Sequence, residues 1–206
     1  MKISKEVIII LLTAFTVSSF AAFSNIPAEA SDNTLSETRE SVIAQYGENK
    51  KITDGNYDKS LAVKCVNGTF VGKKNESVIA YKGIPFVGKQ PVGNLRWKAP
   101  VDVVPDDGVY EAYYNAKTCP QPDGDIAAEY VCGEDCLYLN IWKAKDDSAE
   151  KKPVMVWIYG GAFETGGTAD PNYDGHNFIE ENPDVILVSI GYRVGVLGFF
   201  HLSHQT

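Results

Sequence analysis

The chain has 206 residues, of which 44% are hydrophobic and 22% are charged, a composition that is ordinary for a folded domain. Its formal net charge is −8, from 27 acidic and 19 basic residues. A chain this acidic is not suited to neutralising phosphates, so nucleic acid is excluded as the expected partner. Small molecules and polysaccharides stay open as ligands.

The first thirty residues have the pattern of a secretory signal peptide. Lys2 and Lys5 supply a positive start, an apolar run follows from Val7 to Phe15, and residues 27–30 (Pro-Ala-Glu-Ala) form an A-x-A cleavage pattern. The apolar run is shorter than the roughly 20 residues that a membrane-spanning helix needs. Cleavage after Ala30 is therefore favoured over an uncleaved anchor, and we expect an exported mature protein, extracellular or periplasmic, with no membrane span.

Export places the cysteines in an oxidising compartment, where they can pair. There are four, Cys65, Cys119, Cys132 and Cys136, and their spacing does not choose among three full pairings. A zinc site is the alternative, but Cys132 and Cys136 lack the C-x-x-C spacing that such sites usually show. Disulfide bonding is therefore the expectation, with the pairing left open.

The remaining N-terminal part divides into a polar segment and a strand-rich one. Residues 31–60 are polar with a weak helical pattern, which indicates an N-terminal extension. Residues 61–66 and 69–71 flank the pair Asn67-Gly68, which favours a type I′ hairpin turn. Residues 77–81 follow a second turn. The pattern predicts a small antiparallel β meander.

The rest of the chain predicts loops and then three buried strands. Residues 83–135 are interrupted by many glycines and prolines and are expected to be irregular. Residues 137–142 alternate between apolar and polar side chains, whereas residues 154–159 and 185–190 are continuous apolar runs. Continuous runs are typical of strands that are covered on both faces, as in a sheet sandwiched by helices. The expected fold class is α/β, with the meander followed by the first strands of a central mixed sheet.

Residues 154–163, Val-Met-Val-Trp-Ile-Tyr-Gly-Gly-Ala-Phe, carry the most chemical information. A buried strand runs directly into a glycine-rich turn, where the missing Cβ atoms allow consecutive backbone N–H groups to converge. Convergent N–H donors are what an acyl-transfer enzyme uses where negative charge develops on a carbonyl oxygen. A tight turn without chemistry explains this run equally well by itself, because Gly-Gly turns are common.

Four further motifs decide between these interpretations. They are residues 81–86 (YKGIPF), 95–97 (LRW), 134–142 (EDCLYLNIW) and 191–199 (GYRVGVLGF). In order and spacing, these motifs and the turn resemble the type-B carboxylesterase family, the cholinesterase-like branch of the α/β-hydrolases. The similarity extends from about Val63 to Phe199. The run that starts at Glu134 is the family's second signature, and it departs only at Ala144, where Pro, Gln or Arg is usual.

The resemblance implies a fold, an activity and roles for individual residues. Residues 61–206 would be the N-terminal, incomplete part of an α/β-hydrolase domain of a serine esterase that acts on small-molecule carboxylic esters. Neither a metal nor an organic cofactor is implied. Gly161 and Ala162 would give their backbone N–H groups to the oxyanion hole, and Phe163 would line the pocket. Tyr159 stands where many α/β-hydrolases have histidine, a substitution that the family tolerates.

The same resemblance assigns two structural pairs. Cys119 and Cys136 would form the family's first disulfide. This bond would close a loop of about 18 residues and stabilise the fold by about 3 kcal/mol. The other two cysteines have no counterpart and can pair with each other or stay free. Arg96 and Glu134 would form a buried ion pair whose loss costs a few kcal/mol. The disulfide loop contains no Trp to receive a quaternary ammonium, so choline esters are not the expected substrates.

The remaining catalytic groups are absent from the sequence. A serine esterase of this class needs a serine on a G-x-S-x-G elbow, then an acidic residue and a histidine, and the 206 residues contain no such elbow. None of His176, His201 and His204 lies where the family's base would. The chain is therefore expected to be inactive and poorly soluble alone, because a sheet cut short exposes an unpaired edge. Its oligomeric state stays open.

Two alternatives to the esterase interpretation are kept. The first is a catalytically inactive, cholinesterase-like binding or adhesion protein. The glycine-rich turn argues against it, because a dead site has no use for the donors. The second is a genuine short protein with another role, which an incomplete sheet disfavours.

Overall fold

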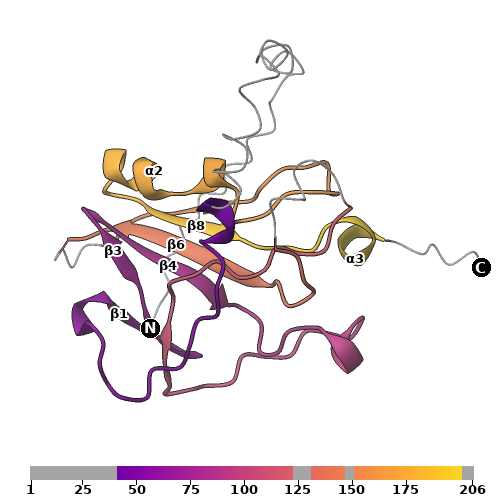
Figure 1. Ribbon diagram of the computed structural model, residues 1–206, viewed down its shortest axis with the longest axis horizontal. Coiled ribbons are helices and arrows are strands. Elements are labelled where there is room, and N and C mark those ends of the chain that lie inside the picture. Colours follow the sequence, from indigo (N-terminus) through magenta and orange to yellow (C-terminus); the bar gives the residue numbers. More distant parts are fainter. Residues whose placement is uncertain (1–40, 123–130, 147–150, 201–206) are drawn as a thin grey trace, which may run out of the picture.

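The computed structural model describes residues 41–122, 131–146 and 151–200. A five-stranded mixed sheet with the strand order β3-β4-β6-β8-β7 forms its centre (Figure 1). The first four strands in this order pair antiparallel with their neighbours, and β7 pairs parallel with β8. The strands are β3 (Lys73–Asn75), β4 (Val78–Pro85), β6 (Tyr138–Ala144), β7 (Val154–Trp157) and β8 (Ile186–Ile190).

A second, three-stranded sheet has the order β1-β2-β5. It consists of β1 (Ala62–Cys65), β2 (Gly68–Val71) and β5 (Val109–Glu111), with β2 and β5 parallel. The strands of the predicted meander are thus divided between two sheets, and β5 lies in a segment expected to be loop. The division occurs at Gly72, where an added Cβ would lie 2.8 Å from the carbonyl oxygen of Ala80. Only glycine allows so tight a passage from β2 to β3.

The turn between β1 and β2 is not the predicted type I′ turn. Cys65 pairs with Gly68, so the central residues are Val66 and Asn67. Neither has the positive φ that a type I′ turn requires at both positions, whereas Gly68 has φ 135°. The side chain of Asn67 donates a hydrogen bond to the carbonyl oxygen of Pro85 at 2.8 Å. This bond ties the hairpin to the end of β4.

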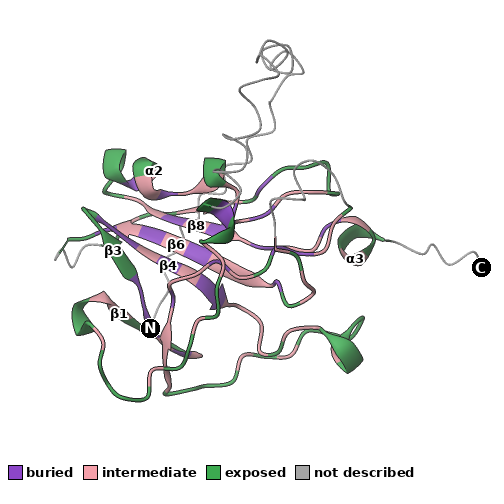
Figure 2. Cartoon of the chain, viewed as in Figure 1, coloured by how far each residue is buried: buried purple, intermediate pink, exposed green. Residues whose placement is uncertain are grey.

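Both faces of the five-stranded sheet are covered. One cluster of buried side chains lies toward the small sheet (Phe70, Ile79, Tyr81, Ile84 and Ala112) and a second lies toward α2 (Val78, Trp142, Ala144, Ile179 and Leu187). Figure 2 shows the buried residues along β4, β6 and β8 between these layers. The α/β fold class with an incomplete central mixed sheet is therefore confirmed.

The helices are short. They are α2 (His176–Glu181) and α3 (Gly195–Phe199), together with the 3₁₀ helices η2 (Lys59–Leu61), η3 (Gly93–Leu95) and η5 (Pro171–Tyr173). In the described ranges no helix has the length and apolarity needed to cross a membrane. The proposed leader lies outside those ranges.

The polar segment before β1 packs against the small sheet from its first described residues. Val42 is fully buried, and isolated bridges join Tyr46 to Asn115 and Lys51 to Tyr110. The amide of Asn49 donates to the carbonyl oxygens of Lys82 (2.9 Å) and Tyr114 (3.1 Å). Its carbonyl oxygen accepts from the N–H groups of Tyr113 (2.8 Å) and Tyr114 (3.1 Å). One side chain thus holds three segments together.

Candidate functional site

The glycine-rich turn follows β7, the strand at one end of the large sheet. Tyr159 is buried, whereas the residues from Gly160 to Glu164 are exposed. The carbonyl oxygen of Gly161 accepts from the N–H groups of Glu164 (2.9 Å) and Thr165 (3.0 Å). The chain is therefore folded back on itself at the end of the strand, with the turn open to solvent.

The backbone of the turn lies in the left-handed region at three successive residues. The φ angles are 132° at Gly161, 54° at Ala162 and 66° at Phe163. A Cβ at Gly161 would lie 2.1 Å from the carbonyl oxygen of Thr165, so this position requires glycine. Non-glycine residues in this region carry about 1–3 kcal/mol of strain each, and such strain concentrates at functional sites. Glycine therefore accounts for the left-handed backbone at residue 161, whereas Ala162 and Phe163 adopt it although they carry a Cβ.

The backbone N–H groups of Gly161 and Ala162 have no acceptor among the described residues. Most backbone N–H groups in folded proteins are paired, either within the protein or with water. Residues 161 and 162 are exposed, so water has access to both donors. The turn therefore leaves two successive backbone donors without a protein acceptor in the described part of the chain.

Two stacked tyrosines, Tyr159 and Tyr192, hold the end of the strand that leads into the turn. The hydroxyl of Tyr159 donates to the carbonyl oxygen of Tyr192 at 2.6 Å, and the hydroxyl of Tyr192 donates back to the carbonyl oxygen of Tyr159 at 2.5 Å. The ring centroids are 4.2 Å apart. Burial raises the pKa of Tyr159, so its hydroxyl stays a donor even at alkaline pH values at which an exposed tyrosine ionises. The tyrosine at the usual histidine position thus anchors the strand end.

The disulfide loop contacts the residues just after the turn through Gln121. Cys119 and Cys136 are bonded, as the family resemblance implied. Gln121, inside this loop, donates to the carbonyl oxygen of Gly166 and accepts from its N–H group, both at 3.0 Å. Sequence reasoning missed Gln121, because nothing in its local pattern indicates a contact 45 residues away. The two other cysteines form no disulfide with each other in the described part of the chain.

Phe163 packs on α3, through its ring and through its backbone. Its ring lies 4.6 Å from that of Phe199, and its side chain is 63% exposed. Its carbonyl oxygen accepts from the N–H group of Gly195 at 2.6 Å. A cavity of about 1080 Å³ lies elsewhere, beside the small sheet, where Phe70 and Tyr110 contribute to its wall. The pocket-lining role of Phe163 stays a prediction. The structure shows that its ring contacts Phe199.

Arg96 and Glu134 form the expected ion pair, but the pair is not buried. Arg96 contacts both carboxylate oxygens of Glu134, with Nε 2.9 Å from Oε2. The two side chains are 45% and 33% exposed. Water screens a pair at this depth, so its contribution is about 1 kcal/mol or less, not the few kcal/mol expected of a buried pair.

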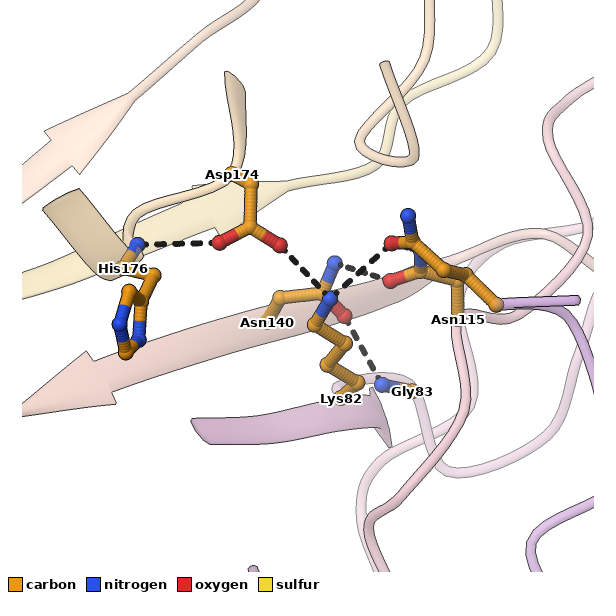
Figure 3. Close-up of polar contacts among 7 residues, drawn as sticks. Lys82, Gly83, Asn115, Asn140, Asp174 and His176 are labelled. Atoms are coloured by element: carbon orange, nitrogen blue, oxygen red, sulfur yellow. Dashed lines mark hydrogen bonds and ion pairs between the residues drawn. The ribbon is translucent and has the colours of Figure 1, made fainter. Parts of the chain in front are cut away.

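Polar contacts join β4 and β6 to the segments that carry Asn115 and Asp174 (Figure 3). The side chain of Asn140 accepts from the N–H group of Gly83 and donates to Asn115, both at 2.9 Å. Lys82 contacts Asp174 at 2.9 Å, and its side chain is 14% exposed. These contacts connect segments that are far apart in the sequence.

The described residues supply donors without a nucleophile. His176 begins α2, where its N–H group donates to Asp174 at 3.0 Å, and His201 and His204 lie outside the described residues. The site consists of an open turn fixed by the tyrosine pair, Gln121 and α3. Such an arrangement can stabilise negative charge on an oxygen, but it cannot by itself begin an acyl transfer.

Comparison with known proteins identifies relatives of the chain. The model of the carboxylesterase family matches residues 59–206. A para-nitrobenzyl esterase of Bacillus subtilis is 40% identical over 66% of the chain, and a probable cholinesterase of Acanthamoeba polyphaga mimivirus is 36% identical over 66%. The chain spans 28% and 24% of the lengths of these two relatives.

Solved structures agree with the sequence relatives. A carboxylesterase of Geobacillus stearothermophilus has a TM-score of 0.60 and 40% identity, covering 69% of this chain and 28% of that one. A thermophilic PNB esterase has a TM-score of 0.63 and 37% identity, covering 70% of this chain and 30% of that one. At these identities and TM-scores the chain shares its fold with the matching parts of both structures.

Proposed function

Because the chain belongs to the carboxylesterase family, we propose that it supplies the oxyanion-stabilising part of a serine carboxylic-ester hydrolase. The observation that carries the proposal is the pair of N–H groups at Gly161 and Ala162, left without acceptors in the described structure. The substrate class is a small-molecule carboxylic ester, as the names of the esterase relatives suggest.

The proposed chemistry follows from where charge develops. When a serine attacks an ester carbonyl, the carbonyl oxygen becomes an oxyanion in the tetrahedral intermediate. The N–H groups of Gly161 and Ala162 would donate to this oxygen, and the loss of one such donor typically costs about 10²–10³ in rate. The fixed left-handed turn means that the donors need no rearrangement during the reaction. The nucleophile, its acidic partner and the histidine base would come from chain beyond these residues.

The proposal includes two statements about the 206-residue chain itself. Without a G-x-S-x-G elbow it has no esterase activity alone, and its N-terminal thirty residues direct it out of the cytoplasm. Assay of the purified chain with p-nitrophenyl acetate is expected to give no turnover above a buffer blank. Turnover by a monomeric product would contradict the first statement, and retention of the leader on protein recovered inside the cell would contradict the second.

A chimera tests the role of the turn directly. Residues 41–200 would replace the matching segment of the Bacillus subtilis para-nitrobenzyl esterase, whose remainder supplies the other catalytic groups. The folded chimera is expected to hydrolyse p-nitrophenyl acetate. Replacing Ala162 by lactic acid, which substitutes an ester oxygen for the N–H group, should lower kcat by about 10²–10³. A folded chimera whose kcat is unchanged by this single-atom change would overturn the proposal.

A further inference from the structure

Three side chains that the proposed ester chemistry does not use come together far from the turn. They are Glu76, His176 and Glu180, and one ligand atom from each lies within 4.8 Å of the other two. Nε2 of His176 is 3.7 Å from Oε1 of Glu180. We propose that these residues bind a divalent transition-metal ion, with Zn²⁺ as the best fit.

The fold brings the three residues together through separate elements. His176 and Glu180 are four residues apart on α2 and therefore share one side of the helix, while Ile179 is fully buried in the core. Glu76 lies in the turn between β3 and β4, where its φ is 48°. The hydroxyl of the next residue, Ser77, donates to Oε1 of Glu180 at 3.3 Å. The hairpin and the helix are thus already in contact at this point.

The charges of the cluster favour a cation. In the described ranges, neither Glu76 nor Glu180 has a Lys or Arg partner within ion-pair distance. The nearby ammonium of Lys82 is paired with Asp174 instead. The side chains of His176 and Glu180 are 23% and 35% exposed, and Glu76 is exposed, so an ion from solution can reach the cluster. Two carboxylates brought close together repel each other, and a bound cation removes that repulsion.

The donor set selects the type of ion. One imidazole nitrogen with two carboxylate oxygens is a combination that Zn²⁺ accepts, with a fourth position left for water. Cu²⁺ and Ni²⁺ accept the same ligands. Ca²⁺ and Mg²⁺ require mostly oxygen ligands and more of them. A bound Zn²⁺ would connect the β3–β4 turn to α2 and so fix the helix that covers one face of the large sheet.

Isothermal titration of the exported, metal-free chain with ZnCl₂, after its thiols have been alkylated, tests this site. The expected result is one Zn²⁺ per chain, with a higher melting temperature in its presence. Each of E76Q, H176Q and E180Q should weaken Zn²⁺ binding by at least about tenfold, the lower limit for changes around metal sites. The matched controls E181Q, on the same helix, and H201Q/H204Q should leave it unchanged.

Other results would overturn the assignment. They are the absence of stoichiometric binding, loss of binding in H201Q/H204Q, or equal affinity for Mg²⁺. Circular dichroism shows whether a variant is folded. If H176Q fails to fold, E76Q on its exposed turn decides by itself, because unchanged Zn²⁺ affinity in E76Q excludes the cluster.

Discussion

The segment before β1 and the turn after β7 differ in whether backbone hydrogen-bonding groups have partners in the protein. In the first, the side chain of Asn49 makes four hydrogen bonds to backbone groups of Lys82, Tyr113 and Tyr114. In the second, the N–H groups of Gly161 and Ala162 have no acceptor in the described part of the chain. The first arrangement satisfies every partner and stabilises the fold. The second leaves two backbone N–H donors without a protein partner and depends on contacts with neighbouring segments for its shape.

The difference shows how a small domain separates stability from chemistry. Paired polar groups, such as those of Asn49 and Asn140, contribute to folding because few buried groups can be left unmatched. The turn instead relies on Tyr159, Gln121 and α3 to hold a strained backbone. Substitutions in the first region should therefore change the unfolding free energy, and substitutions in the second should change activity.

The largest expected effect is in the turn. Gly161→Ala in the chimera would place a Cβ 2.1 Å from the carbonyl oxygen of Thr165, so the turn must rearrange and move its donors. We expect kcat for p-nitrophenyl acetate to fall by about 10²–10³. Gly160→Ala is the matched control, because an added Cβ there meets nothing within 4 Å. Equal losses in both variants would mean that the donors are not the cause.

Removal of the disulfide should affect both regions. The double variant C119S/C136S is expected to lower the unfolding free energy by about 3 kcal/mol, measured by urea denaturation. Because Gln121 links the disulfide loop to Gly166, hydrogen exchange in residues 160–166 should also accelerate. C65S, which leaves the bridge intact, should do neither. Unchanged exchange in the turn would show that Gln121 holds its place without the bridge.

Asn49→Ala should destabilise the fold without changing the turn. The four hydrogen bonds of this side chain would be lost, and the expected decrease in unfolding free energy is about 2 kcal/mol. Asn56→Ala is the control, because Asn56 is exposed. Faster hydrogen exchange in residues 45–52, with residues 160–166 unaffected, would support the separation of the two regions. The reverse pattern would contradict it.

Alkaline pH should weaken the attachment of the N-terminal segment. Burial raises the pKa of Tyr46 from 10.0 to about 12. Since the folded-state pKa lies above the unfolded value, the stabilising contribution is complete below pH 10 and is lost as the pH rises toward 12. The urea midpoint of the chain should therefore fall over this range, and Y46F should fall less steeply. Identical slopes in the two proteins would exclude Tyr46 as a source.

The smallest expected effect is at the exposed ion pair. Arg96→Gln should lower the unfolding free energy by about 1 kcal/mol or less, and added salt should reduce the difference. Lys64→Gln is a comparison, because Lys64 and Asp107 are 74% and 96% exposed and no measurable change is expected. A loss of several kcal/mol in the Arg96 variant would contradict the screening of this pair by water.

Some features could be predicted from local patterns and others could not. The turn at residues 160–163 and strands β6, β7 and β8 follow from apolar runs and glycine positions. The contacts of Asn49 span 33 and 65 residues, so no local pattern indicates them. The left-handed φ angles of Ala162 and Phe163 contradict local preference, because the surrounding contacts outweigh it. The bond between Cys119 and Cys136 was available only from family resemblance, since spacing allows three pairings.

The open side of β7 has a practical consequence for handling the chain. Among the described residues this strand ends the order of the large sheet, with Val154 38% exposed and Ile158, just after the strand, 56% exposed. Unused backbone groups beside apolar side chains act as a template on which a strand from another molecule can dock. A high protein concentration therefore favours aggregation through the edge of β7. Dilution, or a partner that covers this edge, favours the monomer.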